Sequence, residues 1–275
     1  AVEVTNVHHM EDLRNQGVQF RDGLGNFSEE LAEYRYGKQE LSAGAVEQAT
    51  NDMLEDTQLM YFPWRREVVR YPGQELLLDL RTARNRNLVT RDEQLELYSG
   101  VRPAIFGLSV GSNIVDRLTQ SGIGNAYLLG DYDRVGVTNL NRIQANMADI
   151  GLRKTVVAGR KMSLIDPYIE QTHLDSGYAI GETDDALREW QPTVIIDEVD
   201  NLAIKAMLRR TARELEVPLI MVGDIGENVV VDVERYDLDK DYPPFHGKVR
   251  DELVEKMLAN EDLDANERVE VLVAI

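Results

Sequence analysis

The residues best suited to chemistry gather in the stretch from Arg102 to Asp133, where a short apolar run leads into a turn. The glycine and serine positions of that turn are Gly107, Ser109, Gly111 and Ser112. Glycines let a backbone approach a phosphate, and a helix starting there offers unpaired N–H groups and a positive dipole end. A second apolar run ends in Asp131 and Asp133, and an acid there accepts from ribose hydroxyls. The order strand, turn, helix, strand, acid therefore predicts a nucleotide-binding unit.

A second group of polar residues follows the same unit along the chain. It includes Asn139, Arg142 and Lys154. Each taken singly is most simply a surface residue, and the turn lacks the third glycine of the usual dinucleotide fingerprint. Only the ordered occurrence of these residues favours a functional site.

A third group, Asp197 to Asn201, ends a β-branched apolar run at residues 193–196. Such a run is typical of a buried strand. Helical patterns at 184–190 and 202–215 flank it, and strand patterns follow at 218–222 and 228–234. Strands that alternate with helices predict an α/β fold, a doubly wound, mainly parallel, Rossmann-like sheet. Asp197 and Asp200 then lie at the carboxyl end of a central strand, where such sheets bind ligands.

Composition narrows the chemistry. The 275 residues include no cysteine, which removes disulfides, thiolate zinc sites and a cysteine nucleophile. The net charge of -19 argues against a nucleic-acid-binding surface. A bound polyphosphate needs the few local cations and a metal ion. No apolar run is long enough to span a bilayer, and we expect a cytoplasmic protein without a membrane partner.

Three regions are expected along the chain. Residues 1–83 carry mostly helical patterns and form an α-rich N-terminal region, and residues 84–240 form the nucleotide-binding domain. Residues 241–275 form an acidic C-terminal segment, and their apolar ending suits a truncated chain.

From about Arg84 to Asp237 the sequence resembles the ThiF/MoeB superfamily, the adenylating domains related to ubiquitin-activating enzymes. The resemblance rests on the glycine turn and on motifs that occur in the family's order. These are Gly122-x-Gly124, Asp131-x-Asp133, Thr138 to Arg142, Gly151 with Lys154, Asp166-Pro167, and Asp197-x-x-Asp200-Asn201.

The resemblance implies an ATP-dependent adenylyltransferase. It activates a carboxylate, in the family usually the C-terminal glycine of a ubiquitin-like or sulfur-carrier protein, as an acyl-adenylate. By motif position Asp131 accepts from the ribose, Asn139 and Arg142 hold the phosphates, and Lys154 neutralises their charge. Asp200 binds Mg²⁺. Arg86 becomes a candidate for an arginine that reaches the nucleotide, in some members from the partner subunit, so a homodimer is expected.

The reaction is consistent with this set of residues. A carboxylate is already ionised at neutral pH, so no general base is needed for its attack. The barrier lies in bringing two anions together, and Arg142, Lys154, Mg²⁺ and Arg86 are suited to lower it.

The sequence also departs from the family pattern. Leu108 and Ser109 stand where the family favours glycines, which alters the phosphate cradle. Without cysteine there is no transfer to an enzyme thiol and no four-cysteine zinc site. Two alternatives stay open: a catalytically silent nucleotide-binding or dimerisation module, and an NAD(P)-binding oxidoreductase domain.

Overall fold

The protein is described here from a computed structural model that covers residues 1–4, 7–40, 42–225 and 227–274. Its contacts divide the chain into two compact units. The first comprises residues 1–95, 119–122 and 160–169, and the second comprises the remainder through residue 275. Residues 241–275, which the sequence pattern set apart, therefore belong to the second unit. None of the described helices is both long and apolar enough to cross a membrane.

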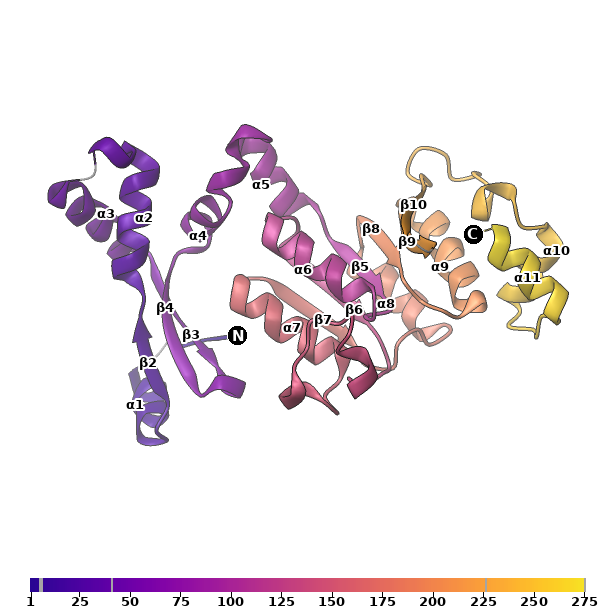
Figure 1. The fold of residues 1–275 in the computed structure, drawn as a ribbon, viewed down its shortest axis with the longest axis horizontal. Coiled ribbons are helices and arrows are strands. Elements are labelled where there is room, and N and C mark those ends of the chain that lie inside the picture. The colour runs from indigo at the N-terminus through magenta and orange to yellow at the C-terminus, as the bar shows by residue number, and fades with distance from the viewer. Residues whose placement is uncertain (5–6, 41, 226, 275) are drawn as a thin grey trace. The chain divides into compact units, whose positions relative to one another are not determined.

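The second unit contains a six-stranded sheet in the order β10-β9-β8-β5-β6-β7 (Figure 1). Neighbouring strands run parallel, except that β10 pairs antiparallel with β9. The strands are β5 (Pro103–Phe106), β6 (Ala126–Gly130), β7 (Glu170–Leu174), β8 (Val194–Asp197), β9 (Leu219–Ile225) and β10 (Asn228–Glu234). The order reverses between β5 and β8, which makes this pair the switch point of a doubly wound sheet. The predicted fold class is confirmed.

Helices alternate with these strands as the sequence predicts, and the last two helices follow β10. They are α5 (Arg91–Gly100), α6 (Gly111–Ser121), α7 (Lys154–Ile165), α8 (Glu182–Trp190), α9 (Leu202–Leu215), α10 (Asp251–Leu258) and α11 (Ala265–Ala274). Leu187 of α8 and Leu208 of α9 pack in one buried cluster with Phe106 and Ile195 of the sheet. The core therefore lies between the sheet and these two helices, and it fixes where β5 and β8 end.

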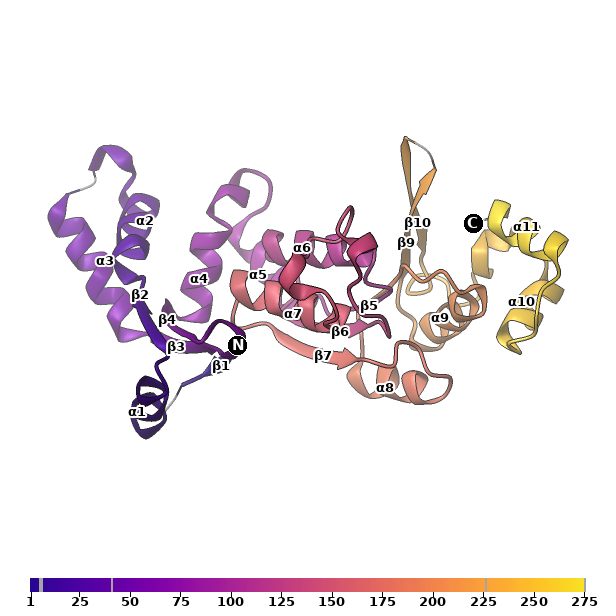
Figure 2. The ribbon, with the colours of Figure 1, turned by 60° about the horizontal axis from the view of Figure 1, so that its bottom comes forward.

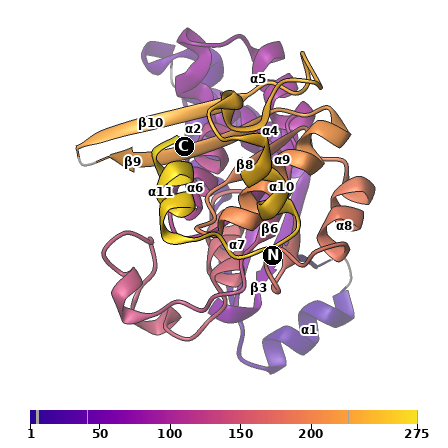
Figure 3. The same ribbon diagram turned by 90° about the vertical axis from the view of Figure 1, so that its right-hand side faces the viewer.

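The β9–β10 hairpin projects from this sheet (Figures 2 and 3). Beside it α10 and α11 pack on α9 through a second buried cluster, which includes Ala206, Leu253, Met257 and Val271. The C-terminal segment is thus tied to the sheet through α9.

The first unit contains a four-stranded sheet in the order β1-β3-β4-β2, with helices α1 to α4 around it. The strands are β1 (Val2–Glu3), β2 (Gln19–Asp22), β3 (Thr57–Phe62) and β4 (Glu67–Pro72). The helices are α1 (Val7–Asn15), α2 (Leu24–Tyr36), α3 (Ala43–Glu55) and α4 (Gln74–Arg81). The sequence pattern predicted an α-rich region but neither α1 nor the sheet, because residues 1–25 show no clear periodicity and the strands alternate only weakly.

Candidate functional site at the switch point

A cavity of about 280 Å³ opens where β5 and β8 end side by side, and we call it the switch-point pocket. Four connections line it: the turn after β5 and the segments after β6, β7 and β8. Its predicted members are Gly107, Ser109, Asp131, Asp133, Lys154, Asp200 and Asn201. Residues predicted from three separate motifs are therefore brought together by the order of the strands.

Position 107 must be glycine because the backbone there passes very close to the backbone of Glu198. The φ of Gly107 is +86°, and a Cβ atom placed there would lie 2.2 Å from the backbone oxygen of Glu198. No other residue satisfies both conditions, since positive φ and zero side-chain volume are needed at once. The turn therefore stays open to a ligand at this point.

Asp131 is buried, and its carboxylate organises the pocket. One oxygen accepts from the backbone N–H of Leu108 at 2.6 Å, and the other accepts from that of Asp133 at 2.7 Å. The Lys154 Nζ atom lies 3.5 Å from Asp131 and 2.7 Å from Asp133. Because a carboxylate has about four acceptor sites, Asp131 retains capacity for a ligand hydroxyl.

Ser109, which stands where a glycine was expected, holds a cation over the turn. Its hydroxyl accepts from Arg142 Nε at 2.9 Å, and its carbonyl oxygen accepts from the Ser112 hydroxyl at 3.0 Å. Arg142 is exposed and otherwise contacts Thr138 and Asn141. Its guanidinium is therefore placed beside the turn although it does not line the pocket.

Other predicted residues have local roles outside the pocket lining. Gly111 begins α6, and Ser112 is buried against the turn. The Asn139 side chain accepts from the backbone of Gly136 at 2.9 Å. The Asn201 side chain, although it lines the pocket, caps α9 by accepting from Ile204 at 3.1 Å.

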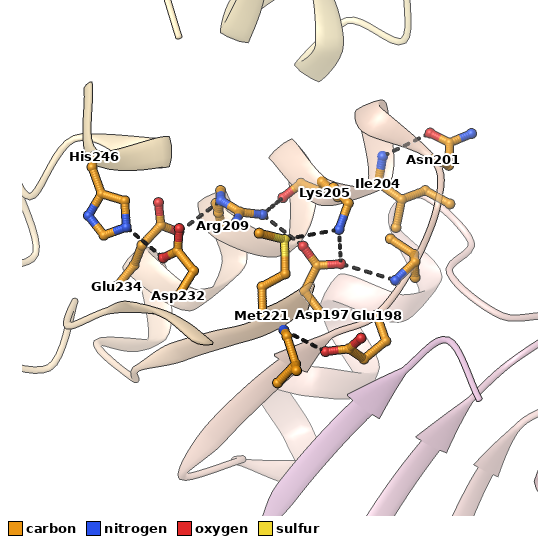
Figure 4. Close-up of polar contacts among 12 residues, drawn as sticks. Asp197, Glu198, Asn201, Ile204, Lys205, Arg209, Met221, Asp232, Glu234 and His246 are labelled. Atoms are coloured by element: carbon orange, nitrogen blue, oxygen red, sulfur yellow. Dashed lines mark hydrogen bonds and ion pairs between the residues drawn. The ribbon is translucent and has the colours of Figure 1, made fainter. Parts of the chain in front are cut away.

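Asp197 lies in a buried ion cluster instead of the pocket lining (Figure 4). Its carboxylate contacts Lys205 at 3.2 Å and Arg209 at 2.8 Å, and Arg209 also pairs with Glu234 at 2.8 Å. All four side chains are nearly or fully buried. The acid at the end of β8 thus joins β8, α9 and β10.

Arg86 belongs to the first unit. It lies in a 3₁₀ turn (Ala83–Asn87), is exposed, and its guanidinium stands 5.9 Å from the centre of the Tyr34 ring. Arg84 shares this turn and is exposed as well.

Glu198 is a carboxyl of the pocket lining whose acidity is altered. Its Oε1 atom accepts from the backbone N–H of Val222 at 2.8 Å. Burial, with the charge of Asp197, raises the pKa of Glu198 to about 7. A carboxyl that is half protonated near neutrality places less negative charge beside an anionic ligand.

Sequence reasoning missed part of the lining, including Tyr132, Gly177, Tyr178, Glu198 and Ile204. Burial and a 2.5 Å bond from its hydroxyl to Asp184 raise the pKa of Tyr178, so its ring stays neutral. The available signal for Glu198 was position, because it lies inside the acidic motif. Tyr178 follows β7, a strand that the sequence pattern did not predict.

No group of three or more metal-binding side chains occurs within the described ranges. Asp200 is exposed at the pocket. A single carboxylate can still suit Mg²⁺, which keeps several waters and is bound largely through substrate phosphates.

A model of the ThiF family matches residues 82–232. An uncharacterized protein of Mycobacterium tuberculosis (strain CDC 1551 / Oshkosh), MT1398, is 35% identical over 229 residues, which are 83% of this chain and 30% of that protein. Ubiquitin-like modifier-activating enzyme 5 of Drosophila virilis is 30% identical over 141 residues, 46% of this chain and 34% of that protein.

Among solved structures, tRNA N6-threonylcarbamoyladenosine dehydratase of E. coli in complex with ATP has a TM-score of 0.50 and 27% identity. The match covers 55% of this chain and 62% of that one. The chain therefore spans less than two thirds of the length of each of these three relatives.

Proposed function

Because the chain belongs to the ThiF family, we propose that it is an ATP-dependent adenylyltransferase that converts a carboxylate into an acyl-adenylate. The observation that carries the proposal is the switch-point pocket, where a glycine turn, a ribose-type acceptor and a buried lysine meet. The relative from E. coli, whose solved structure contains ATP, supports ATP as the nucleotide.

Each part of ATP can be matched to pocket residues of suitable chemistry. Asp131, with its remaining acceptor capacity, receives the ribose hydroxyls, and the turn at Gly107 and Ser109 receives the phosphates. Arg142, which donates to the hydroxyl of Ser109, would contact these phosphates. Asn139, three residues earlier in the chain, would help to bind them. Lys154, fixed between two acids, supplies positive charge without losing its position.

Asp200 is the residue that would hold Mg²⁺ against the phosphates. The bound ion would reduce the negative charge of the triphosphate and of the departing pyrophosphate. Glu198, protonated in part near neutrality, would not compete strongly for it.

The reaction follows from charge and position. An ionised carboxylate oxygen bonds to the α-phosphorus, and the bond from that phosphorus to the bridging oxygen of pyrophosphate breaks. Positioning and preorganised positive charge lower this barrier, and Arg142 and Lys154 provide both. These 275 residues include no cysteine, so none of them can take the acyl group as a thioester.

The carboxylate belongs to a partner. The names of the relatives point to two classes, a modified tRNA for the E. coli protein and a ubiquitin-like modifier for the Drosophila protein. The net charge of -19 favours the protein class, such as a ubiquitin-like or sulfur-carrier protein, because a nucleic acid requires a positive surface.

Return of labelled pyrophosphate into ATP tests the proposal directly. The wild-type protein should catalyse this exchange when a carboxylate acceptor and Mg²⁺ are present. Lys154→Ala should reduce the rate by about a hundredfold or more, in the range found when a preorganised charge contact is removed.

The exposed Lys248 offers a control, and Lys248→Ala should exchange at the wild-type rate. Tight ATP binding without any exchange would instead identify a silent nucleotide-binding module. Preferential binding of NAD(P) would identify an oxidoreductase domain.

A further inference from the structure

Three polar side chains outside the lining of the switch-point pocket lie close together on β10 and in the segment between β10 and α10. Asp232 belongs to β10, Tyr242 to the loop that follows, and His246 to a 3₁₀ turn (Pro244–Gly247). The Tyr242 hydroxyl lies 2.8 Å from His246 Nδ1. The His246 Nε2 atom lies 2.5 Å from an oxygen of Asp232 (Figure 4). A hydroxyl, an imidazole and a carboxylate are thus joined in that order.

The partners of His246 determine which of its ring nitrogens carries the proton. An ionised carboxylate can only accept, so the Nε2 atom beside Asp232 must donate. In a neutral imidazole the Nδ1 atom then has a free lone pair, and it accepts from the Tyr242 hydroxyl. This is the arrangement in which an imidazole can take a proton from a hydroxyl while an acid keeps the ring in the required tautomer.

The turn that carries His246 has an unfavourable backbone conformation. Phe245 and His246 both have a φ of +54°, and neither is glycine. Left-handed residues of this kind cost about 1–3 kcal/mol each, persist only where their surroundings impose them, and gather at functional sites. The cost indicates that the position of the His246 ring matters to the protein.

The surroundings hold these side chains in place. Phe245 is buried in one cluster with Leu253 of α10, and the guanidinium of Arg209 lies 4.0 Å from the centre of its ring. The Tyr242 ring packs against the buried cluster of the sheet and meets the His246 ring edge to face, with 5.6 Å between the ring centres. Side chains supported in this way keep their geometry when a reactant arrives.

The same side chains can be reached from solvent. Those of His246 and Asp232 are 24% and 13% exposed, and Tyr242 is partly exposed. Because the sequence contains no cysteine, these residues offer a hydroxyl paired with a base as a nucleophile in place of a thiol.

We propose that Tyr242 is a nucleophile that takes up an acyl group from an activated acyl compound, an ester or a mixed anhydride with a good leaving group. His246 is the general base, and Asp232 is the residue that positions its ring. The Tyr242 oxygen bonds to the carbonyl carbon while its proton moves to His246 Nδ1. The bond from that carbon to the leaving oxygen breaks, and the leaving group receives the proton.

The product is an aryl ester at Tyr242. The inference does not rest on the proposed adenylation, because any sufficiently activated acyl compound serves as the donor.

Acetylation by p-nitrophenyl acetate tests the proposal without ATP. The 275-residue chain is exposed briefly to the ester and quenched with acid, and acetylation of each tyrosine is measured by peptide mass spectrometry. Tyr36 is the control within the same molecule, because it is 42% exposed and exposure alone would favour it over Tyr242. Tyr242 should nevertheless be acetylated about tenfold faster or more, since a positioned base accelerates attack.

Three variants separate the roles of the other residues. His246→Asn removes the base but keeps a residue that tolerates the left-handed backbone, and acetylation of Tyr242 should fall by about a hundredfold or more. Asp232→Asn should lower it by about tenfold or more, because an amide can donate to Nε2 and favour the wrong tautomer. Asp241→Asn is the matched control, since Asp241 is an exposed acid next to Tyr242, and it should keep the wild-type rate.

Two results would overturn the proposal. The first is acetylation of Tyr36 as fast as that of Tyr242 in the wild-type protein, a comparison that needs no variant to fold. The second is an unchanged rate at Tyr242 in His246→Asn that circular dichroism shows to be folded, which would mean that the three side chains only stabilise the turn. Neither result bears on ATP binding, and failure of pyrophosphate exchange would leave the assignment of Tyr242 standing.

Discussion

At the scale of single residues, Asp131 has the largest expected effect on nucleotide binding. Its carboxylate accepts a hydrogen bond from the turn after β5 and also lines the pocket. Asp131→Ala removes the acceptor for the ribose hydroxyls and for the N–H groups of Leu108 and Asp133. Leaving such groups unpaired costs about 1–3 kcal/mol, so affinity should fall about five- to hundredfold. Because the contact is to the ribose, ATP and adenosine should weaken alike in calorimetry.

Asp185→Ala is the matched control, since the Asp185 side chain is 81% exposed and pairs with Arg188. It should leave both affinities unchanged. Unaltered nucleotide affinity in Asp131→Ala, with the variant folded by thermal melting, would remove Asp131 from the site.

Glu198 predicts a pH dependence of nucleotide binding. Its pKa is raised to about 7 from an ordinary value of 4.5, so the group ionises in the pocket as pH rises through about 7. The new negative charge should weaken AMP binding over that interval. Glu198→Gln should lack this component, and the difference between the two proteins isolates Glu198 because AMP's own titration is common to both.

The same shift sets the sign of a stability effect. Between about pH 4.5 and 7 the folded state holds a proton that the unfolded state has lost, so stability should fall as pH rises through that window. The loss should amount to about 1–3 kcal/mol and be absent in Glu198→Gln. Equal pH profiles for the two proteins, in denaturant melts and in AMP binding, would contradict the raised pKa.

At the scale of elements, Arg209 of α9 joins this helix to β8 and β10. It is 1% exposed, pairs with Asp197 of β8 and Glu234 of β10, and stacks 4.0 Å over the Phe245 ring. Arg209→Leu leaves the buried carboxylate of Glu234 without its cation and that of Asp197 with Lys205 alone. Breaking a buried pair in this way costs about 3–5 kcal/mol, and chemical denaturation should report a loss of that size.

Arg213 lies on the same helix and donates to the carbonyl of Lys240 in an exposed contact. Arg213→Leu should cost less than about 1 kcal/mol, since a single exposed contact contributes little. A comparable loss in the two variants would mean that the buried ion cluster is not what holds these elements together.

The elements of the second unit could be predicted because apolar periodicity and strand–helix alternation agree there. Helix α9 was expected at 202–215 and is observed at Leu202–Leu215. Strand β7 was missed because its residues Glu170–Leu174 are mostly polar, as an edge strand exposed to solvent allows. The first-unit sheet was missed because β1 and β2 have only two and four residues and the six-residue strands β3 and β4 alternate only weakly.

Those residues of the candidate site that belong to sequence motifs could be predicted. Gly107, Asp131, Lys154 and Asp200 stand at motif positions, and the structure brings them to one pocket. Tyr178 could not be found in the same way, because only the pairing of β6 with β7 brings its loop to the edge. The orientation of the Asp197 side chain could not be predicted either. It depends on Lys205 and Arg209 of α9, which lie eight and twelve residues further along the chain.

At the scale of the whole molecule, the net charge of -19 repels a bound triphosphate, so each cationic side chain near the nucleotide should contribute to its binding. We predict a homodimer in which Arg86 of one protomer acts on the nucleotide of its partner. Arg86 is exposed, with its guanidinium 5.9 Å from the centre of the Tyr34 ring, so it is accessible to a ligand. Light scattering should report a dimer in solution.

Substitution at Arg86 should change the rate of adenylation more than the affinity for ATP. A cation aimed at charge that develops in the transition state acts on the chemical step, so Arg86→Ala should slow pyrophosphate exchange with little change in the Kd for ATP. Arg86→Lys should not fully restore the rate, because an ammonium cannot reproduce the planar fork of a guanidinium. Arg84→Ala, in the same exposed turn, serves as the control.

Mixed dimers decide which protomer the arginine serves. Arg86→Ala and Lys154→Ala should each be slow alone, yet a mixture of the two should regain activity. In the hybrid dimer, the site of the Arg86→Ala protomer keeps its own Lys154 and receives Arg86 from the partner. Slow exchange by Arg86→Ala without recovery on mixing would place the arginine within its own protomer, and a monomer in solution would overturn the dimer.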